Sequence, residues 1–144
     1  MDKHNDTELI QFIYQNAEMG KHGLSQLIDK TDDVPFRQAL ESQLHEYQNI
    51  MDSSQQLLKQ RGISPDSVGS TAKAMSSMMT TFKTLSDNST SKMAEMLVEG
   101  NTMGIVKITK HLKEYPDASS EAIALANQLL HTEENNVHQT KSFL

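Results

Sequence analysis

Three pairs of a glutamate and a histidine, each four residues apart, have the side chains best suited to metal binding or acid–base chemistry. The pairs are Glu18 and His22, Glu41 and His45, and Glu134 and His138. Carboxylates and imidazoles are common ligands of metal ions, and residues four apart share a helix face. At about 100° per residue, however, all three pairs turn away from the apolar faces of their predicted helices. We therefore expect them to lie on a solvated surface.

A second set of polar residues falls on the predicted apolar faces themselves: Glu133, Asn136, Asn101, Tyr47 and Gln43. A buried carboxylate is costly unless it is paired or hydrogen-bonded. No lysine or arginine falls clearly on an apolar face, so we expect Tyr47, Gln43 or Asn101 to hydrogen-bond Glu133, whose pKa would be raised. The set is either a polar layer that fixes helix register, as buried asparagine does in coiled coils, or a site for a small ligand or a single ion at Glu133. In a third interpretation the helical wheel is off by one residue and Glu133 lies at the rim.

Glycines and methionines provide two further signals. Gly20, Gly100 and Gly104 lie inside predicted helices, where each costs about 0.5–1 kcal/mol relative to alanine, so we expect close helix packing there. Six of the nine methionines lie between Met75 and Met103. They indicate adaptable packing between helices, or a Met-rich outer face for a homodimer or another protein, or, on softness grounds, a Cu(I) site.

Catalytic motifs are absent from the sequence. None of the many serines and threonines lies in a nucleophile elbow, and there is no glycine-rich phosphate loop. Glu133 and Glu134 would point about 100° apart on a helix, which is a poor geometry for an acid–base pair. We therefore expect a protein that is not an enzyme and carries no cofactor.

The elements that must position these residues are helices. Apolar residues recur at steps of three and four, as in the run Ile10, Ile13 and Ala17, which predicts helices rather than strands. Five helices are predicted, at 7–30, 34–61, 67–85, 91–114 and 118–142. In the helices predicted at 91–114 and 118–142, Gly100 and Leu144 are among the residues expected to face the core.

Capping residues define the predicted helix ends. Asn5 with Glu8 has the spacing of a capping box, and Asp33 followed by Pro35 suits the start of the second helix. Gly62 is expected to end that helix, and Asp117 to cap the last one.

The segment 67–85 has two interpretations, a helical crossover that makes the second and fourth helices parallel, or a fifth helix laid across an up-down bundle. We favour the crossover. Four helices of similar length are what a four-helix bundle requires.

Length and charge limit the class of protein. A chain of 144 residues fits one domain spanning residues 1–144, and a net charge of −6 without a basic stripe argues against nucleic acid as a partner. No apolar run is long enough for a membrane span, and no apolar signal segment follows the N-terminus. Together with the lack of cysteine, this predicts a cytoplasmic protein.

The helix pattern resembles that of the ferritin-like superfamily, in which two long helical hairpins are joined by a crossover. In Leu58-Lys59-Gln60-Arg61-Gly62 and Glu133-Glu134-Asn135-Asn136 the chain is similar to uncharacterised bacterial ferritin-like proteins and spore-coat-type bundles. The resemblance implies an all-α four-helix bundle in up-down-down-up order, with the shorter helix between the hairpins.

The same resemblance implies a di-iron site built from Glu-x-x-His motifs, which this sequence lacks. We therefore expect a non-enzymatic bundle that associates with itself or with a partner. The alternative is a metal-binding or small-ligand protein with a degenerate site around Glu133.

Overall fold

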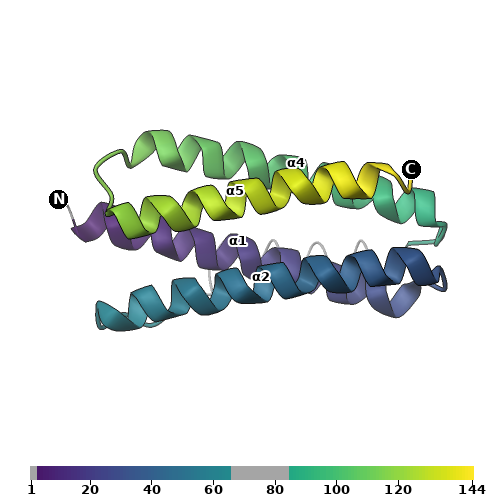
Figure 1. Cartoon of the computed structure of the whole chain (residues 1–144), viewed down its shortest axis with the longest axis horizontal. Coiled ribbons are helices and arrows are strands. Elements are labelled where there is room, and N and C mark those ends of the chain that lie inside the picture. The colour runs from purple at the N-terminus through teal and green to yellow at the C-terminus, as the bar shows by residue number, and fades with distance from the viewer. Residues whose placement is uncertain (1–2, 66–84) are drawn as a thin grey trace.

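The computed structural model describes residues 3–65 and 85–144, with side chains from residue 6 onward, and these residues form four helices without a strand. The helices are α1 (Lys3–Lys30), α2 (Val34–Gln60), α4 (Thr90–Glu114) and α5 (Ser120–Lys141). In Figure 1, α1 and α5 run in one direction, and α2 and α4 run in the other. The chain is therefore an all-α bundle in up-down-down-up order, as predicted.

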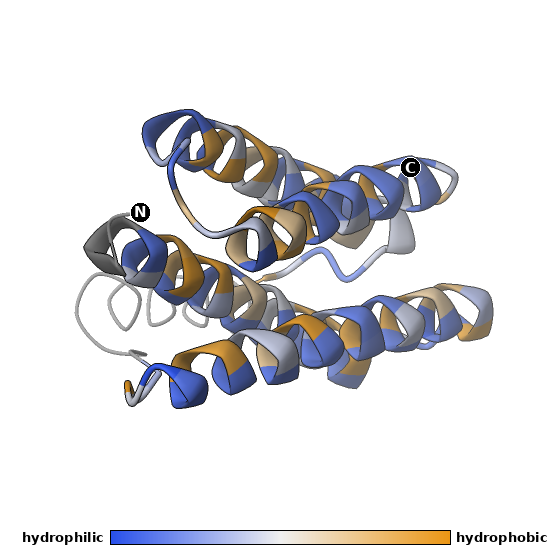
Figure 2. Ribbon diagram, turned by 60° about the vertical axis from the view of Figure 1, so that its left-hand side comes forward, coloured by the Kyte–Doolittle hydropathy of each residue, from blue (hydrophilic) through white to orange (hydrophobic). Residues whose placement is uncertain are grey.

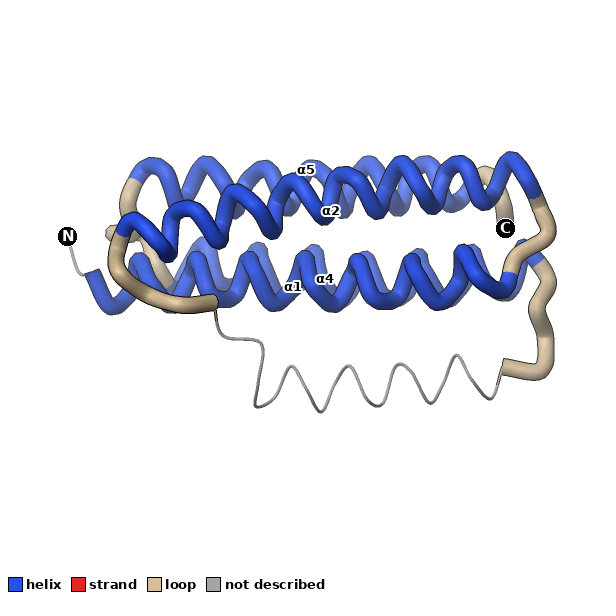
Figure 3. The backbone as a smooth tube through the Cα atoms, turned by 90° about the horizontal axis from the view of Figure 1, so that it is seen from below, coloured by secondary structure: helices blue, strands red, loops and turns tan. Residues whose placement is uncertain are grey.

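The bundle consists of two helical hairpins packed on each other. The most extensive contacts join α1 to α2 and α4 to α5, and α5 also packs against both α1 and α2. Figure 3 shows the chain leaving α2 at one end of the bundle and entering α4 at the other. The parallel direction of α2 and α4 is the one that the crossover interpretation predicted. The predicted helix at 67–85 lies outside the described residues, except for Leu85, which is in the loop before α4.

Helix ends follow local hydrogen-bonding rules, but not always at the predicted residue. Asp33 caps α2, as predicted, by accepting a hydrogen bond of 3.0 Å from the backbone N–H of Phe36. Gly62, with φ of 71°, lies just beyond the C-cap of α2, and the backbone N–H of Ile63 donates to the carbonyl of Leu58. The backbone N–H of Gly62 also donates to the carbonyl of Lys59, and these two bonds form the glycine-terminated end that the sequence predicted.

Two predicted caps are wrong. The first helix begins at Lys3, so Asn5 lies inside α1 and cannot be its N-cap. The last helix is capped by Ser119, whose hydroxyl accepts a hydrogen bond of 3.1 Å from the N–H of Ala122, and Asp117 lies in the preceding turn. Serine and aspartate are about equally good N-caps. The conformation of the turn between α4 and α5 therefore decides that Ser119, and not Asp117, caps the helix.

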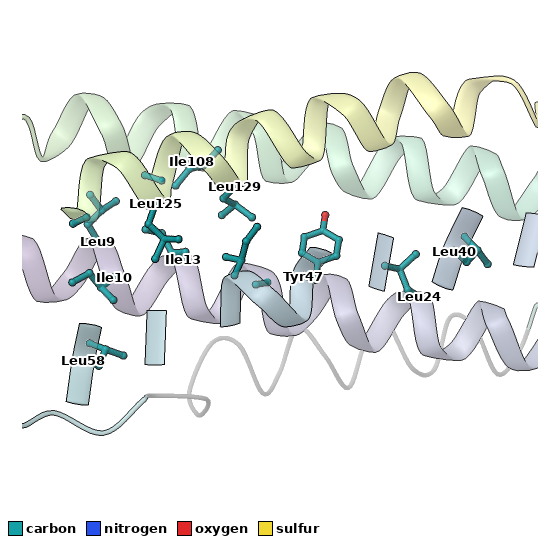
Figure 4. Close-up of a cluster of buried hydrophobic side chains, with 14 of the residues drawn as sticks. Leu9, Ile10, Ile13, Leu24, Leu40, Tyr47, Leu58, Ile108, Leu125 and Leu129 are labelled. Carbon is teal, nitrogen blue, oxygen red and sulfur yellow. The ribbon is translucent and has the colours of Figure 1, made fainter. Parts of the chain in front are cut away.

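The core runs along the length of the bundle. Apolar residues of all four helices face inward, while hydrophilic residues cover the outer faces (Figure 2). Figure 4 shows part of this core, with Leu9, Ile13, Leu24, Leu58, Ile108 and Leu129 among its side chains. No helix of the described part of the chain is both long and apolar enough to cross a membrane.

Two predicted inward positions are wrong. Gly100 is exposed, and the buried position in that turn of α4 belongs to Asn101, 7% exposed. Leu144 is 59% exposed, because α5 ends at Lys141 and the chain leaves the bundle after it. A drift of one residue along a helix rotates a side chain by about 100°, which is enough to exchange an inward for an outward position.

Candidate functional site

The middle of the bundle contains a polar layer to which α2, α4 and α5 contribute. We define this central layer as Tyr47 from α2, Asn101 from α4, and Glu133 and Asn136 from α5. All four are at most 7% exposed. They lie between apolar residues toward both ends of the bundle, so the layer is enclosed by core.

Two glycines make room for the largest groups of the layer. A Cβ atom added to Gly20 of α1 would lie 2.7 Å from Cζ of Tyr47, and one added to Gly104 of α4 would lie 2.0 Å from Oε2 of Glu133. Both distances are below van der Waals contact, so the Tyr47 ring and the Glu133 carboxyl group pack directly on helix backbone. This accounts for Gly20 and Gly104, whereas a Cβ atom added to Gly100 would meet no atom within 4 Å.

Hydrogen bonds connect three helices through the Tyr47 hydroxyl, which points toward α4 and α5 in Figure 4. It donates to Oδ1 of Asn101 at 2.9 Å and lies 3.5 Å from Oε2 of Glu133. The shorter distance marks the main acceptor, because hydrogen bonds between oxygens cluster near 2.7–2.8 Å. The carboxyl group of Glu133 is the second and more distant acceptor of the same hydroxyl.

Gln43 is buried, as its position on the helix predicted, but its hydrogen bonds lie elsewhere. Its Nε2 donates to Oε1 of Gln139 at 2.9 Å and to Oγ1 of Thr140 at 3.1 Å. Gln43 therefore joins α2 to α5 about one turn away from the hydroxyl of Tyr47. Of the three partners expected for Glu133, only Tyr47 makes a direct contact with it.

Burial governs the ionisation of the layer. Loss of water raises the pKa of Glu133 to about 8, although hydrogen bonds from Tyr47 and Asn16 act in the opposite direction. Burial and the nearby Glu133 also raise the pKa of Tyr47 well above its ordinary value. Glu133 takes part in none of the ion pairs formed by the described residues. It is therefore mainly neutral near pH 7.

Several polar atoms of this region have no hydrogen-bond partner within the described part of the chain. They are Oε1 of Glu133, Nδ2 of Asn101, Nδ2 of Asn136 and Oε1 of Gln43. The set combines two donors with two acceptors. The amide N–H groups among these atoms disfavour a bare cation, because they repel positive charge.

A di-iron centre does not fit the residues present. His22, His45, His138, Glu41 and Glu134 are exposed, as predicted. Glu18 differs from the prediction, since it is only partly exposed, one of its carboxylate oxygens is buried, and burial raises its pKa. In residues 3–65 and 85–144, no three His, Asp or Glu side chains come together in a way that could hold a metal.

One buried polar cluster was missed at the sequence level, the end clasp formed by Asp6, Arg61 and Ser119. Oδ1 of Asp6 accepts a hydrogen bond of 2.8 Å from the backbone N–H of Ser119, and Oδ2 lies 2.6 Å from Nε of Arg61. Arg61 also donates to the Ser119 hydroxyl at 3.3 Å. The clasp joins the start of α1, the end of α2 and the α4–α5 turn. Asp6 continues the spacing of the α1 core, four residues before Ile10, which was the available signal.

The apolar residues expected on outer faces divide into two groups. Phe12 is partly buried and stacks on His111 of α4, with ring centres 3.8 Å apart, so it belongs to the packing between α1 and α4. Met93 is fully buried, whereas Met103 is 60% and Val106 48% exposed on the outer face of α4. Met75, Met78 and Met79 lie outside the described residues.

Comparison with known proteins gives a family and a fold. The chain matches a family described as a domain of unknown function, DUF2383, over residues 7–114. Since the match covers most of the chain, this protein belongs to that family. Gly20, Tyr47, Asn101 and Gly104 lie inside the matched range, and Glu133 lies beyond it.

Among solved structures, the chain is similar to the crystal structure of a DUF305 fragment from Deinococcus radiodurans, with a TM-score of 0.77 and 12% sequence identity. The similarity covers 96% of this chain and 93% of the other, and at this identity it shows the fold alone. No curated protein matches the chain.

Proposed function

Starting from membership of a family without an assigned role, we propose that this chain is a non-enzymatic helical bundle that acts by association, with a second copy of itself or with another protein. The observation that carries the proposal is the exposure of two large apolar side chains, Met103 and Val106, three residues apart on the outer face of α4. Such side chains gain free energy when a partner removes them from water, and exposed apolar patches often mark interaction sites.

The placement of the polar groups supports association over catalysis. Glu133, whose pKa of about 8 would suit proton transfer near neutral pH, is 2% exposed and sealed between core layers. A general acid or base must reach its substrate at hydrogen-bond distance. The exposed pairs Glu41 and His45, and Glu134 and His138, lie on the outer faces of two different helices, α2 and α5.

Light scattering across a concentration series tests the proposal. The wild-type protein is expected to increase in average mass from low to high micromolar concentration, and replacement of Met103 and Val106 by serine is expected to reduce that increase. Ile105→Ser, at a partly buried neighbour, controls for a general loss of stability. A wild-type protein that stays monomeric at high micromolar concentration would count against self-association.

A second candidate function is the binding of a small polar ligand, or of a single ion, around Glu133 in a ferritin-like bundle. The unpartnered atoms of Glu133, Asn101 and Asn136 favour it, since buried polar groups are normally hydrogen-bonded. The up-down-down-up helix order supports a relationship to the ferritin-like superfamily, and the absence of cysteine fits the cytoplasm as the proposed location.

Metal analysis of protein purified without chelator separates an ion from the other ligands. Stoichiometric Fe, Mn or Zn that is lost in Glu133→Gln and kept in Glu134→Gln would support an ion at Glu133. Sub-stoichiometric metal in the wild-type protein would exclude it. Native mass spectrometry of the same sample detects a bound organic molecule.

A further inference from the structure

The outer face of α4 carries a second regular stripe, opposite the one that faces the core. Its members recur at steps of four, four, three, four and three residues, which keeps them on one side of a helix. They are Glu95, Glu99, Met103, Val106, Lys110 and Lys113, and all six are exposed. The stripe extends over roughly 27 Å at 1.5 Å per residue.

The two ends of this stripe carry opposite charges. Two glutamates lie toward the start of the helix, two lysines toward its end, and two apolar residues between them. We infer that α4 packs antiparallel against α4 of a second copy, about a two-fold axis that passes between Met103 and Val106. This inference rests on the proposed function and gives it a partner and a geometry.

The antiparallel register follows from aligning the stripe of one copy with the same stripe of the second copy. When Met103 of one copy lies opposite Val106 of the other, Glu99 lies opposite Lys110, and Glu95 lies within one residue of the position opposite Lys113. An interface around a two-fold axis contains every such pair twice. A parallel arrangement would instead place glutamate beside glutamate and lysine beside lysine, which the repulsion of like charges disfavours.

The two charged pairs are not equivalent. Glu95 already forms an ion pair of 2.9 Å with Lys92 on its own helix, so it is less available to a partner. Neither Glu99 nor Lys110 forms an ion pair with another of the described residues. The pair Glu99–Lys110 is also nearer to the apolar centre, where water is better excluded. It should therefore contribute more to the register than Glu95–Lys113.

An interface one helix wide is small by the standards of stable dimers, so the association is expected to be weak and sensitive to salt. Sedimentation velocity at low salt and high micromolar concentration is a suitable measurement. Glu99→Lys places lysine opposite Lys110, and Lys110→Glu places glutamate opposite Glu99. Each variant alone should dimerise at least about tenfold more weakly than the wild type, since every unfavourable pair occurs twice.

Mixing the two variants provides the decisive measurement. A chain with Glu99→Lys paired with a chain carrying Lys110→Glu restores opposite charges at both positions, so the mixture should form a heterodimer near wild-type strength. Glu41→Lys, at an exposed position of α2, makes the same charge change away from the stripe and should leave dimerisation unchanged. Circular dichroism verifies that each variant is folded.

The possible failures are distinguishable. If the wild type dimerises and both single variants dimerise equally well, the α4 interface is wrong while the proposed self-association stands. If the mixture fails to recover although each variant is impaired, the antiparallel register is wrong. If the wild type is monomeric under all these conditions, both the interface and the self-association are overturned.

Discussion

Asp6 in the end clasp and Glu133 in the central layer are almost equally buried, with 3% and 2% of their surfaces exposed. Burial alone would raise the pKa of both carboxyl groups. At Asp6, hydrogen bonds from Ser119 and the charge of Arg61 outweigh burial and lower the pKa. At Glu133 burial prevails, and the pKa rises to about 8. At Asp6 the local partners outweigh the cost of burial, whereas at Glu133 they do not.

This contrast assigns opposite pH dependence to the two regions. A raised pKa in the folded state means that stability is greatest below the unfolded pKa and is lost as the pH rises toward the folded pKa. A lowered pKa means that stability is present above the unfolded pKa and is lost as the pH falls. The end clasp is therefore destabilised as the pH falls below the ordinary pKa of aspartate, and the central layer as the pH rises from about 4.5 toward about 8.

The largest effect is expected for Glu133→Gln. Wild-type stability should fall by about 4–5 kcal/mol from Glu133 alone as the pH rises from near 4.5 to near 8, and the neutral glutamine should remove this loss. Urea unfolding followed by circular dichroism at acidic, neutral and mildly alkaline pH measures it. Glu134→Gln, at the exposed neighbour, is the control. Equal pH slopes in wild type and Glu133→Gln would show that Glu133 ionises normally.

A smaller effect of opposite pH dependence is expected for Asp6→Asn. The variant should lose about 2–3 kcal/mol at neutral pH, because charge-assisted hydrogen bonds to Arg61 and Ser119 are lost or weakened. The difference from wild type should shrink as the pH falls below the ordinary pKa of aspartate toward the lowered pKa of Asp6, because Asp6 then loses its charge. Asp117→Asn, in the adjacent exposed turn, controls for net charge. A difference that stays constant down to strongly acidic pH would contradict the ion pair.

Gly104→Ala should cost about 1–2 kcal/mol, since the added methyl group collides with the Glu133 carboxyl group, whose flexible end can move only partly. Gly100→Ala, one turn earlier in the same helix, is the matched comparison. It meets open space and should stabilise the protein by about 0.5–1 kcal/mol. Thermal unfolding of both variants shows whether each substitution lowers or raises the stability of the protein. Stabilisation by both substitutions would mean that Gly104 is not held against Glu133.

A smaller loss of stability, about 1 kcal/mol, is expected for Tyr47→Phe, which removes the hydrogen bond to Asn101 and keeps the ring against Gly20. Because the Tyr47 hydroxyl lowers the pKa of Glu133, its loss should also move the alkaline end of the pH dependence upward. The pH series used for Glu133→Gln detects this shift. An unchanged pH profile would indicate that the 3.5 Å contact carries no hydrogen bond.

Much of the fold could be predicted from local pattern. Steps of three and four residues located the four described helices within about five residues at each end, and Asp33 and Gly62 defined the ends of α2 through rules that involve only neighbouring residues. The wheel also placed Glu133, Tyr47 and Asn101 on inward faces. It failed at Gly100 and Leu144, where a small angular error or the end of a helix changes exposure.

The sequence by itself determined the helices, their apolar faces and the polar residues that lie on those faces, because these depend on periodicity and on contacts a few residues apart. Only the tertiary structure decided which residues meet across the bundle. Tyr47 packs on Gly20, Glu133 packs on Gly104, and Asp6 reaches Ser119 across 113 residues of chain. The charge of a buried carboxyl group depends on such distant partners, so Asp6 and Glu133 acquire opposite pKa shifts only when the four helices come together.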